Sequence, residues 1–566
     1  MNILNSRWSV WLPQSVLSLR HYTLKMFSAD LIAGVTVGFV ALPLAMAFAI
    51  SSGLTPQAGI YCAVVTGFLI SALGGSRQQI GGPTGAFVVV IAGILARHGL
   101  NGLFLCTMMA GVFLILLGIT GLGSAVKFLP RPVIIGFTNG IAVLIASTQI
   151  KDFFGLQVAS VPGEFLPRLM ALARHAATIS LPTTLLGLLS LLSLVLIMRY
   201  AKRVPGSIVV TVVATLLVAA FKLPVATIGT KFGNIPTGFP VPHLPVFHAE
   251  LIPALLPSAL TVAMLGAIES LMSAVVADRM SGSKHNPNVE LIGQGIANVV
   301  SPLFGGLPAT GAIARTATNI RAGALTPVAG MIHALVLLLV LLFAAPLARF
   351  IPLATLAAIL MIVSYNMGEW KEIPHLLKTS KADIAVWLVT FGLTVFADLT
   401  VAVEAGMILA ALLYIRRVAN TTSIAYVDEE YLEAGRAHNL QDKEIPDYVA
   451  IFGIHGPMLF GSSDKLDIIE TRIEKLPPIV ILRLRNMTAL DATGLLAMEE
   501  LAVKLSKTGR ALILCGAREQ PTQLMEHAGF ADHVGISNIC PNLERALARA
   551  REFRISYQEE PQKESS

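Results

Sequence analysis

The sequence has little charge, and the charge it has is unevenly placed. Only 13% of its 566 residues are charged, whereas an average soluble domain has about 25%, and 54% are hydrophobic. The stretch 31–76 contains no charged residue. A soluble fold is therefore excluded for most of the chain, and we expect residues 28–420 to lie in a membrane, preceded by a cytosolic segment 1–27.

Cysteine is also scarce, and the patterns of metal sites and active sites are missing. The four cysteines, Cys62, Cys106, Cys515 and Cys540, have neither metal-ligand spacing nor the pattern of a disulfide framework. The histidines are scattered, and no nucleophile–base pair is apparent. The sequence therefore predicts no enzyme, no metal site and no cofactor.

The net charge of +7 could indicate a nucleic-acid partner, but its distribution favours a membrane. Lys and Arg lie at the ends of apolar runs, and more of them fall on one side than on the other. This bias is typical of the cytoplasmic face and places both termini in the cytoplasm, with the chain in a bacterial-type inner membrane. We expect a lipid bilayer as partner and no nucleic acid.

The apolar runs predict an all-α membrane protein with fourteen transmembrane segments. Seven segments per half force the two halves into opposite orientations, which is an inverted repeat. A helix needs about 20 apolar residues to cross a bilayer, and the third and tenth segments are shorter than that. The expected ranges are 30–52, 57–74, 84–97, 102–123, 132–150, 181–199, 207–224, 252–277, 289–304, 310–322, 325–346, 351–366, 383–399 and 400–416.

A short phrase opens both short segments. It reads Gly81-Gly82-Pro83-Thr84-Gly85-Ala86-Phe87 in the first half and Gly305-Gly306-Leu307-Pro308-Ala309-Thr310-Gly311-Ala312-Ile313 in the second. Helices that begin at mid-membrane expose unpaired N–H groups and partial positive charge, so two facing starts predict an anion site. Thr84 and Thr310 suit N-cap positions. Alternatively, both phrases only kink full-length helices.

Arg315 and Glu269 lie inside predicted spans, where charge is costly and usually functional. Arg315 follows the second phrase and adds positive potential, unless it reaches the interface or pairs structurally. Glu269 lies deep in the eighth segment, where desolvation disfavours the charged carboxylate and suits reversible proton binding. It either carries a coupling proton or is a permanent partner of Arg315. Ser273, one turn away, is expected to share its site.

The end of the chain reads as a separate, soluble part. We expect a linker over 421–445, a small α/β domain over 446–553 and a disordered tail over 554–566. Short β-rich runs alternate there with amphipathic helices. The expected strands are 449–454, 479–484 and 511–515, and the expected helices are 492–507, 522–528 and 543–553.

Several motifs, in order, resemble the SulP (sulfate permease) family of anion transporters with a C-terminal STAS domain. The resemblance covers residues 20–553 and implies fourteen spans as a core and a gate domain, elevator-like movement and a homodimer. It implies that Phe48, Thr84, Gly85, Ala86 and the segment Thr310, Gly311, Ala312 and Ile313 surround the anion, with Arg315 nearby. The motifs are Pro43-x-x-x-Ala47-Phe48-Ala49, Gly53-Leu54-x-Pro56-x-x-Gly59-Ile60-Tyr61, Gly82-Pro83-Thr84-Gly85, Asn288-x-Glu290-Leu291-x-x-Gln294-Gly295-x-x-Asn298 and Arg315-Thr316-Ala317-x-Asn319.

Three departures from the family pattern bear on function. Leu44 stands where many relatives have Gln. Ile313 stands where sodium-coupled relatives have a hydroxyl residue, so sodium coordination is poor and Glu269 favours proton coupling. Ala492 stands where related STAS domains carry a phosphorylated serine, which argues against that switch.

The sequence thus predicts a secondary active transporter that couples a small anion to protons. The anion is left open among a sulfate-like ion, bicarbonate and a dicarboxylate, and so is exchange rather than symport. Two alternatives remain: a nucleobase:proton symporter of the same fold, and a regulatory scaffold centred on the STAS domain with a cytosolic protein partner. Arg315 and the soluble tail argue against the first, and the repeated phrase argues against the second.

Overall fold

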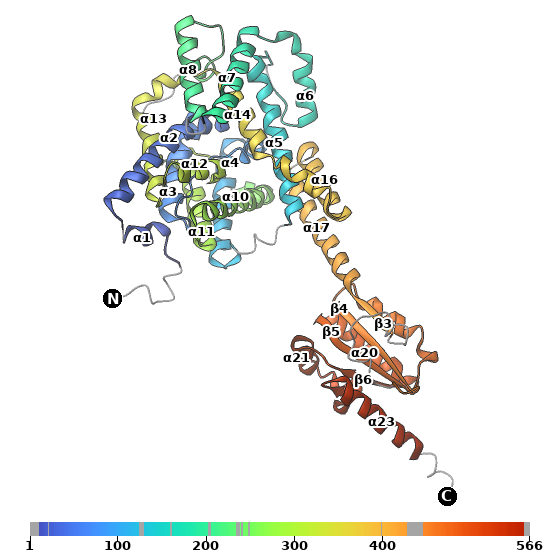
Figure 1. The fold of residues 1–566 in the computed structure, drawn as a ribbon. Helices are drawn as coiled ribbons and strands as arrows, with labels where there is room; N and C mark the ends of the chain where they lie inside the picture. The colour runs from blue at the N-terminus through green and yellow to red at the C-terminus, as the bar shows by residue number, and fades with distance from the viewer. Residues whose placement is uncertain are drawn as a thin grey trace. The chain divides into compact units, whose positions relative to one another are not determined.

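The computed structural model describes residues 11–20, 22–123, 130–158, 161–201, 205–233, 238, 241–246, 249–397, 399–426 and 445–559. The chain divides into two compact units, Met1–Ile408 and Leu409–Ser566. The division falls inside the helix Leu399–Thr421, close to the change in composition at Arg417. Figure 1 shows the helical unit in blue to yellow and the mixed unit in orange and red.

The first unit is helical apart from two short strands. Among the described residues, eight helices are long and apolar enough to cross a membrane. Each expected apolar range coincides with a helix, and the number that cross the bilayer stays a prediction. The helices are α1 Gln14–Leu19, α2 Leu24–Ser51, α3 Pro56–Leu73, α4 Phe87–Ile119, α5 Arg131–Phe154, α6 Phe165–Arg174, α7 Leu181–Tyr200, α8 Gly206–Phe221, α9 Ile228–Phe232, α10 Ile252–Ser281, α11 Pro287–Val300, α12 Ile313–Arg321, α13 Val328–Ala348, α14 Leu353–Met367, α15 Ile373–Leu376, α16 Lys381–Phe396 and α17 Leu399–Thr421.

Helix α4 contains the third and fourth predicted segments. The two parts meet at Gly99, whose φ of 67° interrupts the helical backbone. Glycine adopts this conformation without the steric cost of a Cβ atom, so the chain changes direction there. Helix α6 was not predicted, because its ten residues have a mixed, amphipathic composition that does not resemble a membrane span.

Close approaches between helices hold this unit together. Gly111 of α4 packs against Gly295 of α11, where a Cβ on Gly111 would lie 2.6 Å from the Gly295 carbonyl oxygen. A Cβ on Gly34 of α2 would be similarly close to the side chain of Ile332 of α13. Small residues at such contacts let membrane helices gain van der Waals contact without a hydrophobic driving force. These contacts set the positions of α4 and α11 around the site.

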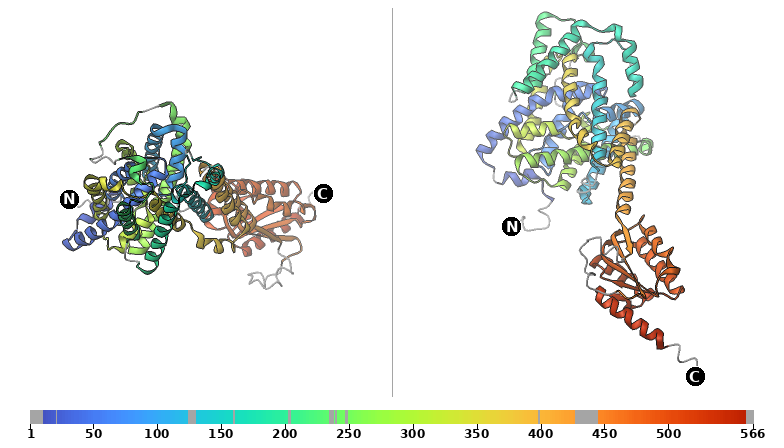
Figure 2. Two further views of the ribbon diagram at one scale, coloured as in Figure 1. Left: turned by 90° about the horizontal axis from the view of Figure 1, so that it is seen from above. Right: turned by 45° about the vertical axis from the view of Figure 1, so that its right-hand side comes forward.

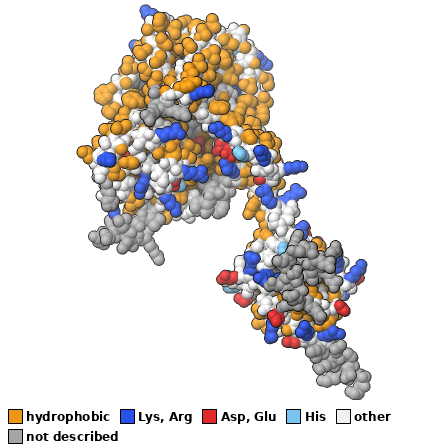
Figure 3. Space-filling view, viewed as in Figure 1, with side chains coloured by type: hydrophobic (Ala, Val, Ile, Leu, Met, Phe, Trp, Pro, Cys, Tyr) orange, Lys and Arg blue, Asp and Glu red, His pale blue; other side chains and the backbone are white. Residues whose placement is uncertain are grey.

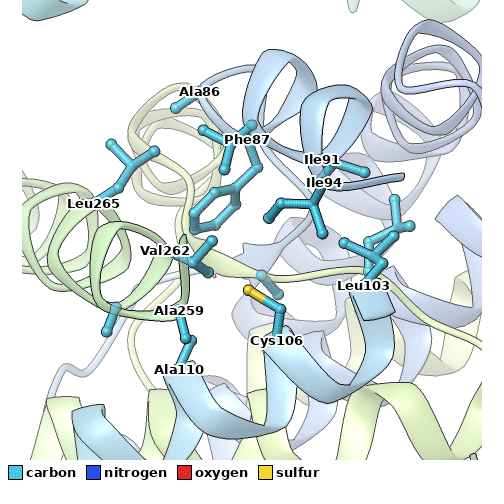
Figure 4. Packing of buried hydrophobic residues seen from close by; sticks show 14 of the residues in the cluster. Ala86, Phe87, Ile91, Ile94, Leu103, Cys106, Ala110, Ala259, Val262 and Leu265 are labelled. Atoms are coloured by element: carbon cyan, nitrogen blue, oxygen red, sulfur yellow. The ribbon is translucent and has the colours of Figure 1, made fainter. Parts of the chain in front are cut away.

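An apolar core surrounds the start of α4. Figure 4 shows the Phe87 ring between α4 and α10, close to Val262 and Leu265. Phe87 is 1% exposed, and Cys106 and Ala110 from the second part of α4 belong to the same cluster. The first turn of α4 is therefore anchored by packing rather than by a capping side chain.

The second unit is a sheet covered by helices, as predicted for the α/β domain. Strands β3 Ser423–Tyr426, β4 Val449–Met458, β5 Ile479–Leu490, β6 Ala511–Cys515 and β7 Ile539–Cys540 follow one another across the sheet. Among the described strands of this sheet, only the β3–β4 pair is antiparallel. Helix α20 Ala492–Lys507 packs on one face, and α23 Leu543–Glu559 packs on the other (Figure 2).

The predicted linker and the predicted tail each contain regular structure that was not expected. Strand β3 lies at the start of the predicted linker 421–445, where a polar composition concealed a strand whose buried residue is Ile424. Helix α23 continues to Glu559, into the range 554–566 that was expected to be disordered. Its arginines lie over aromatic rings, such as Arg554 over Tyr448 and Arg549 over Phe553. The remaining residues of both ranges lie outside the described parts.

Candidate functional site

The two copies of the repeated phrase meet in space. Strand β1 Gly81–Gly82 pairs antiparallel with β2 Thr310–Gly311, and the backbone N–H of Ala312 donates to the carbonyl oxygen of Ile80 at 2.8 Å. Helices α4 and α12 begin directly after these extended segments. The phrases are thus starts of two helices that lie together, and the alternative of two kinked full-length helices is wrong.

The threonines of the phrases do not cap these helices. Ala86 precedes α4 and Ala312 precedes α12, so the prediction of N-caps at Thr84 and Thr310 is wrong. The reason is that each threonine lies too far before its helix: Thr310 is in strand β2, and Thr84 precedes a turn that leads into α4. The Thr84 hydroxyl instead donates to Glu269 Oε2 at 2.9 Å, and the Thr310 hydroxyl donates to the Gly266 carbonyl at 2.8 Å. Both threonines therefore tie their phrase to α10.

Arg315 connects α12 to the first phrase. Its side chain is 2% exposed, and Nη2 donates to the Pro83 carbonyl oxygen at 2.5 Å. A Cβ on Gly82 would lie 2.6 Å from Arg315 Nη1, so the glycine makes room for the guanidinium. Nη1 has no hydrogen-bond partner among the described residues. Arg315 does not reach the interface, and within the described chain it forms no ion pair with Glu269.

A cavity of about 530 Å³ lies beside the two helix starts. Eight of the predicted site residues line it: Phe48, Thr84, Gly85, Glu269, Gly311, Ala312, Ile313 and Arg315. Three predicted residues, Ala86, Thr310 and Ser273, are fully buried nearby without lining it. Leu44, at the position where relatives often have Gln, also lies on the wall. The wall is therefore mostly apolar, with few polar groups that converge on one region.

The opposite wall was not predicted. It is formed by α5 and by the end of α14, through Val133, Ile134, Phe137, Thr138, Val363, Asn366, Met367 and Glu369. The apolar members have no signal that distinguishes them from ordinary packing residues. Glu369 does carry a signal, since it is an acidic residue just beyond the predicted span 351–366, but nothing in the sequence brings it to the site.

A buried polar network lies behind the cavity. Ser273 Oγ and Thr316 Oγ1 are 3.0 Å apart, and Thr316 Oγ1 accepts from the Ile80 backbone N–H at 3.0 Å. Asn319 Nδ2 donates to the Gln78 carbonyl at 2.8 Å. Ser273 was expected to share the site of Glu269. It instead contacts Thr316, which holds the backbone just before the first phrase.

A second part of this network converges on Glu290. Its Oε2 accepts from the backbone N–H groups of Gly75 and Ser76, at 2.8 and 3.1 Å. Its Oε1 accepts from Ser270 Oγ at 3.2 Å and Gln294 Nε2 at 3.0 Å. Ser270 in turn accepts from Gln79 Nε2 at 3.0 Å. The segment that leads into the first phrase is thus held through buried hydrogen bonds.

Comparison with known proteins identifies both the membrane unit and the second unit. The model of the sulfate permease family matches residues 27–390, and that of the STAS domain matches residues 440–546. The putative sulfate transporter YvdB of Bacillus subtilis is 41% identical over 517 residues, which cover 91% of this chain and 96% of that protein. The chain belongs to the sulfate permease family.

Two further similarities agree with this assignment. The bicarbonate transporter BicA of Synechocystis is 35% identical over 539 residues, 92% of this chain and 94% of that protein. The structure of the murine anion transporter Slc26a9 in an inward-facing state aligns with a TM-score of 0.85 at 21% identity, over 96% of this chain and 94% of that chain. The last similarity concerns the fold alone. The sulfate permease member described here is a membrane transporter and not an enzyme.

Proposed function

We propose that this sulfate permease member carries a small anion across the cell membrane by proton symport. The single observation that carries the proposal is the Thr84–Glu269 hydrogen bond in the cavity beside the starts of α4 and α12. It places a carboxylate that can bind a proton directly against the position where an anion is attracted. The named transport of sulfate by one relative and of bicarbonate by another supports this class of substrate.

The anion is bound mainly by backbone groups. The first N–H groups of α4 and α12 have no partner within their own helices, and the two helix starts add partial positive charge. Gly85 and Gly311 line the cavity without side chains that would cover these groups. Arg315 contributes a full positive charge to the same wall. Backbone binding of this kind accepts a sulfate-like ion, bicarbonate or a dicarboxylate.

Glu269 provides the coupling. Its carboxylate accepts a hydrogen bond from Thr84 and is not neutralised by Arg315, so a proton can bind without breaking an ion pair. Protonation removes a negative charge from the cavity and makes anion binding more favourable. Ile313 supplies no oxygen ligand for a sodium ion, which supports the proton as coupling ion.

The walls of the cavity suggest how the anion moves. One wall comes from α2, from Thr84 and Gly85 before α4, and from α10 and α12, and the other comes from α5, α17, the end of α14 and Glu369 beyond it. A site at the boundary between two groups of helices can be exposed alternately when one group moves against the other. An elevator-like movement is therefore part of the proposal. We also propose a homodimer in the inner membrane with cytoplasmic termini and a cytosolic protein partner of the STAS domain.

Uptake into proteoliposomes tests the proposal. The full chain is reconstituted, and accumulation of labelled sulfate, bicarbonate, chloride, succinate and fumarate is measured with and without an inward proton gradient. Wild-type protein accumulates at least one of these anions when the outside is acidified. Glu269→Gln loses acceleration by the proton gradient but still exchanges the anion, because the helix starts and Arg315 remain.

Two variants sharpen this experiment. Thr84→Val removes the donor to Glu269 and shifts the pH dependence of uptake without abolishing it. Glu164→Gln changes an exposed carboxylate just before α6 that does not line the cavity, and it behaves as wild type. Undiminished pH-driven accumulation by Glu269→Gln contradicts the coupling role, and the absence of any pH-driven anion uptake by the wild type contradicts the proposed function.

A further inference from the structure

The cavity contains a second carboxylate, on the wall formed by α5 and the end of α14. Glu369 follows α14 and immediately precedes the short 3₁₀ helix Trp370–Glu372. It lines the cavity together with Glu269 and Arg315, and it is half-buried. Its backbone N–H donates to Asn139 Oδ1 of α5 at 2.7 Å, and Asn139 is fully buried. The position of Glu369 on this wall is therefore fixed by α5.

The carboxylate of Glu369 differs from its neighbours in having no direct partner. Glu372, three residues later, forms an ion pair with Arg131 at 2.8 Å, and Glu269 accepts from Thr84. Within the described residues, no group donates a hydrogen bond to the Glu369 carboxylate. The Glu369 carboxylate therefore holds no other described group in place by a hydrogen bond. The residue is half-buried and lines the cavity.

An unpaired negative charge is unfavourable in a cavity that attracts anions. With both glutamates ionised, the charged side chains that line the cavity sum to one net negative charge, because only Arg315 opposes them. Two like charges repel by several kcal/mol at short range in a partly dehydrated site. Proton binding to either glutamate makes this sum zero, and proton binding to both makes it positive.

We propose that Glu369 is a second proton-binding group of the transport pathway, which admits the anion when protonated and favours its release when ionised. This inference rests on the proposed function. In it, Glu269 carries the proton that moves with the anion, whereas Glu369 exchanges its proton at the mouth of the cavity. Asn366 lines the same wall and is exposed, so the cavity is open to the outside of the protein near Glu369.

The other charges around Glu369 are few. The Arg131–Glu372 ion pair lies close enough to act on it electrostatically, and Glu269 and Arg315 line the same cavity. Lys371 and His375 belong to the next turns of the chain. Figure 3 shows acidic side chains gathered between Lys and Arg on one face of the membrane unit, below a mainly hydrophobic surface. Arg131 is already paired with Glu372, so it does not replace a proton on Glu369.

The side of the membrane is part of this inference. Glu369 belongs to the wall formed by α5 and α14, whereas the proposed anion site belongs to the segment Thr84–Gly85 before α4 and to α10 and α12. If the two walls move relative to each other, the bound anion lies next to Glu369 in only one of the two orientations. The pH on one side of the membrane therefore controls anion affinity through Glu369, and the pH on the other side does not.

The test compares Glu369→Gln with the matched variant Glu372→Gln in proteoliposomes of the full chain. The KM for the best substrate of the wild type is measured as the pH is varied separately inside and outside. In wild type, KM rises with pH on both sides because of Glu269, and it rises more steeply on one side because of Glu369. We expect Glu369→Gln to lower KM on that side at alkaline pH about three- to tenfold, from removal of one nearby charge, while uptake stays accelerated by a proton gradient. Glu372→Gln changes the profile less than Glu369→Gln does, because Glu372 does not line the cavity.

Further outcomes decide the inference. Glu369→Asp keeps a carboxylate and retains the wild-type pH dependence if the inference is correct. The inference is overturned if Glu369→Gln has the KM profile of the wild type, or if Glu372→Gln changes the profile as much as Glu369→Gln does. A failure of the proposed function gives a different result from a failure of this inference. In the first case, the wild type itself shows no pH-driven anion uptake.

Discussion

At the scale of single residues, the buried carboxylates of the membrane unit differ in the number of groups that donate to them. Asp30 accepts from Tyr22 and from both the backbone and the hydroxyl of Thr326, and Glu290 accepts from four donors. Glu269 accepts only from Thr84 within the described chain. A carboxylate with many donors holds its neighbours in place, whereas one with a single donor can exchange a proton at little structural cost.

This difference predicts a structural role for Glu290. In Glu290→Gln, one side-chain acceptor becomes an NH₂ group that faces donors from Gly75 and Ser76 or from Ser270 and Gln294. A buried donor without a partner costs about 1–3 kcal/mol, so we expect a lower melting temperature of the purified protein. Ser270→Ala removes the hydrogen bond from Gln79, and we expect it to lower the melting temperature less than Glu290→Gln does. Equal melting temperatures of Glu290→Gln and wild type contradict this role.

The sequence predicted part of the site at this scale. Arg315 and Glu269 were found because charge within an apolar segment is costly, and the phrase residues were found because they repeat. The caps at Thr84 and Thr310 were wrong, since the extended pairing of β1 with β2 is a contact between the two halves that no local pattern reveals. Glu369 was missed because its neighbours in the cavity lie far away in the sequence.

At the scale of elements, glycines decide how closely the helices approach one another. Within α4, Gly111 packs against α11 and Gly93 is solvent-exposed, with no atom within 4 Å of the position of a Cβ. The two positions provide a matched pair. The first supports the packing of α4 against α11, and the second has no packing role in the described structure.

We therefore expect opposite behaviour of two alanine variants. Gly111→Ala places a Cβ 2.6 Å from the Gly295 carbonyl oxygen and forces α4 and α11 apart, which lowers stability by about 1–3 kcal/mol. Gly93→Ala causes no loss, because its methyl group meets no neighbour and alanine favours the helix. Thermal unfolding in detergent measures both. An unchanged melting temperature for Gly111→Ala shows that the helices can separate without cost.

The positions of most elements followed from composition. Each predicted apolar range coincides with a helix, although the bounds differ by several residues in places, and strand β6 and helix α20 have the predicted bounds. The short segments began later than expected, at Phe87 and Ile313, because strand pairing takes up the residues before them. Helix α6 and strand β3 were missed because both are short and have polar residues among their apolar ones.

At the scale of the whole molecule, the chain consists of a membrane unit and a STAS unit with separate cores. The clusters around Phe87 and around Leu44 belong to the first unit, and the two faces of the sheet form the cores of the second. The sequence predicted this division from the change in charge at Arg417. It did not predict the site as a whole, because the cavity exists only once two halves, 224 positions apart, lie together.

The central claim is that an anion binds in the cavity where α4 and α12 begin. The most direct measurement is a structure of the full-length protein determined with a saturating concentration of a transported anion. The account predicts density for the anion within hydrogen-bond distance of the backbone N–H groups at the starts of both helices, on the cavity side of Thr84 and Arg315. Density for the anion elsewhere in the membrane unit, with this position empty, contradicts the account.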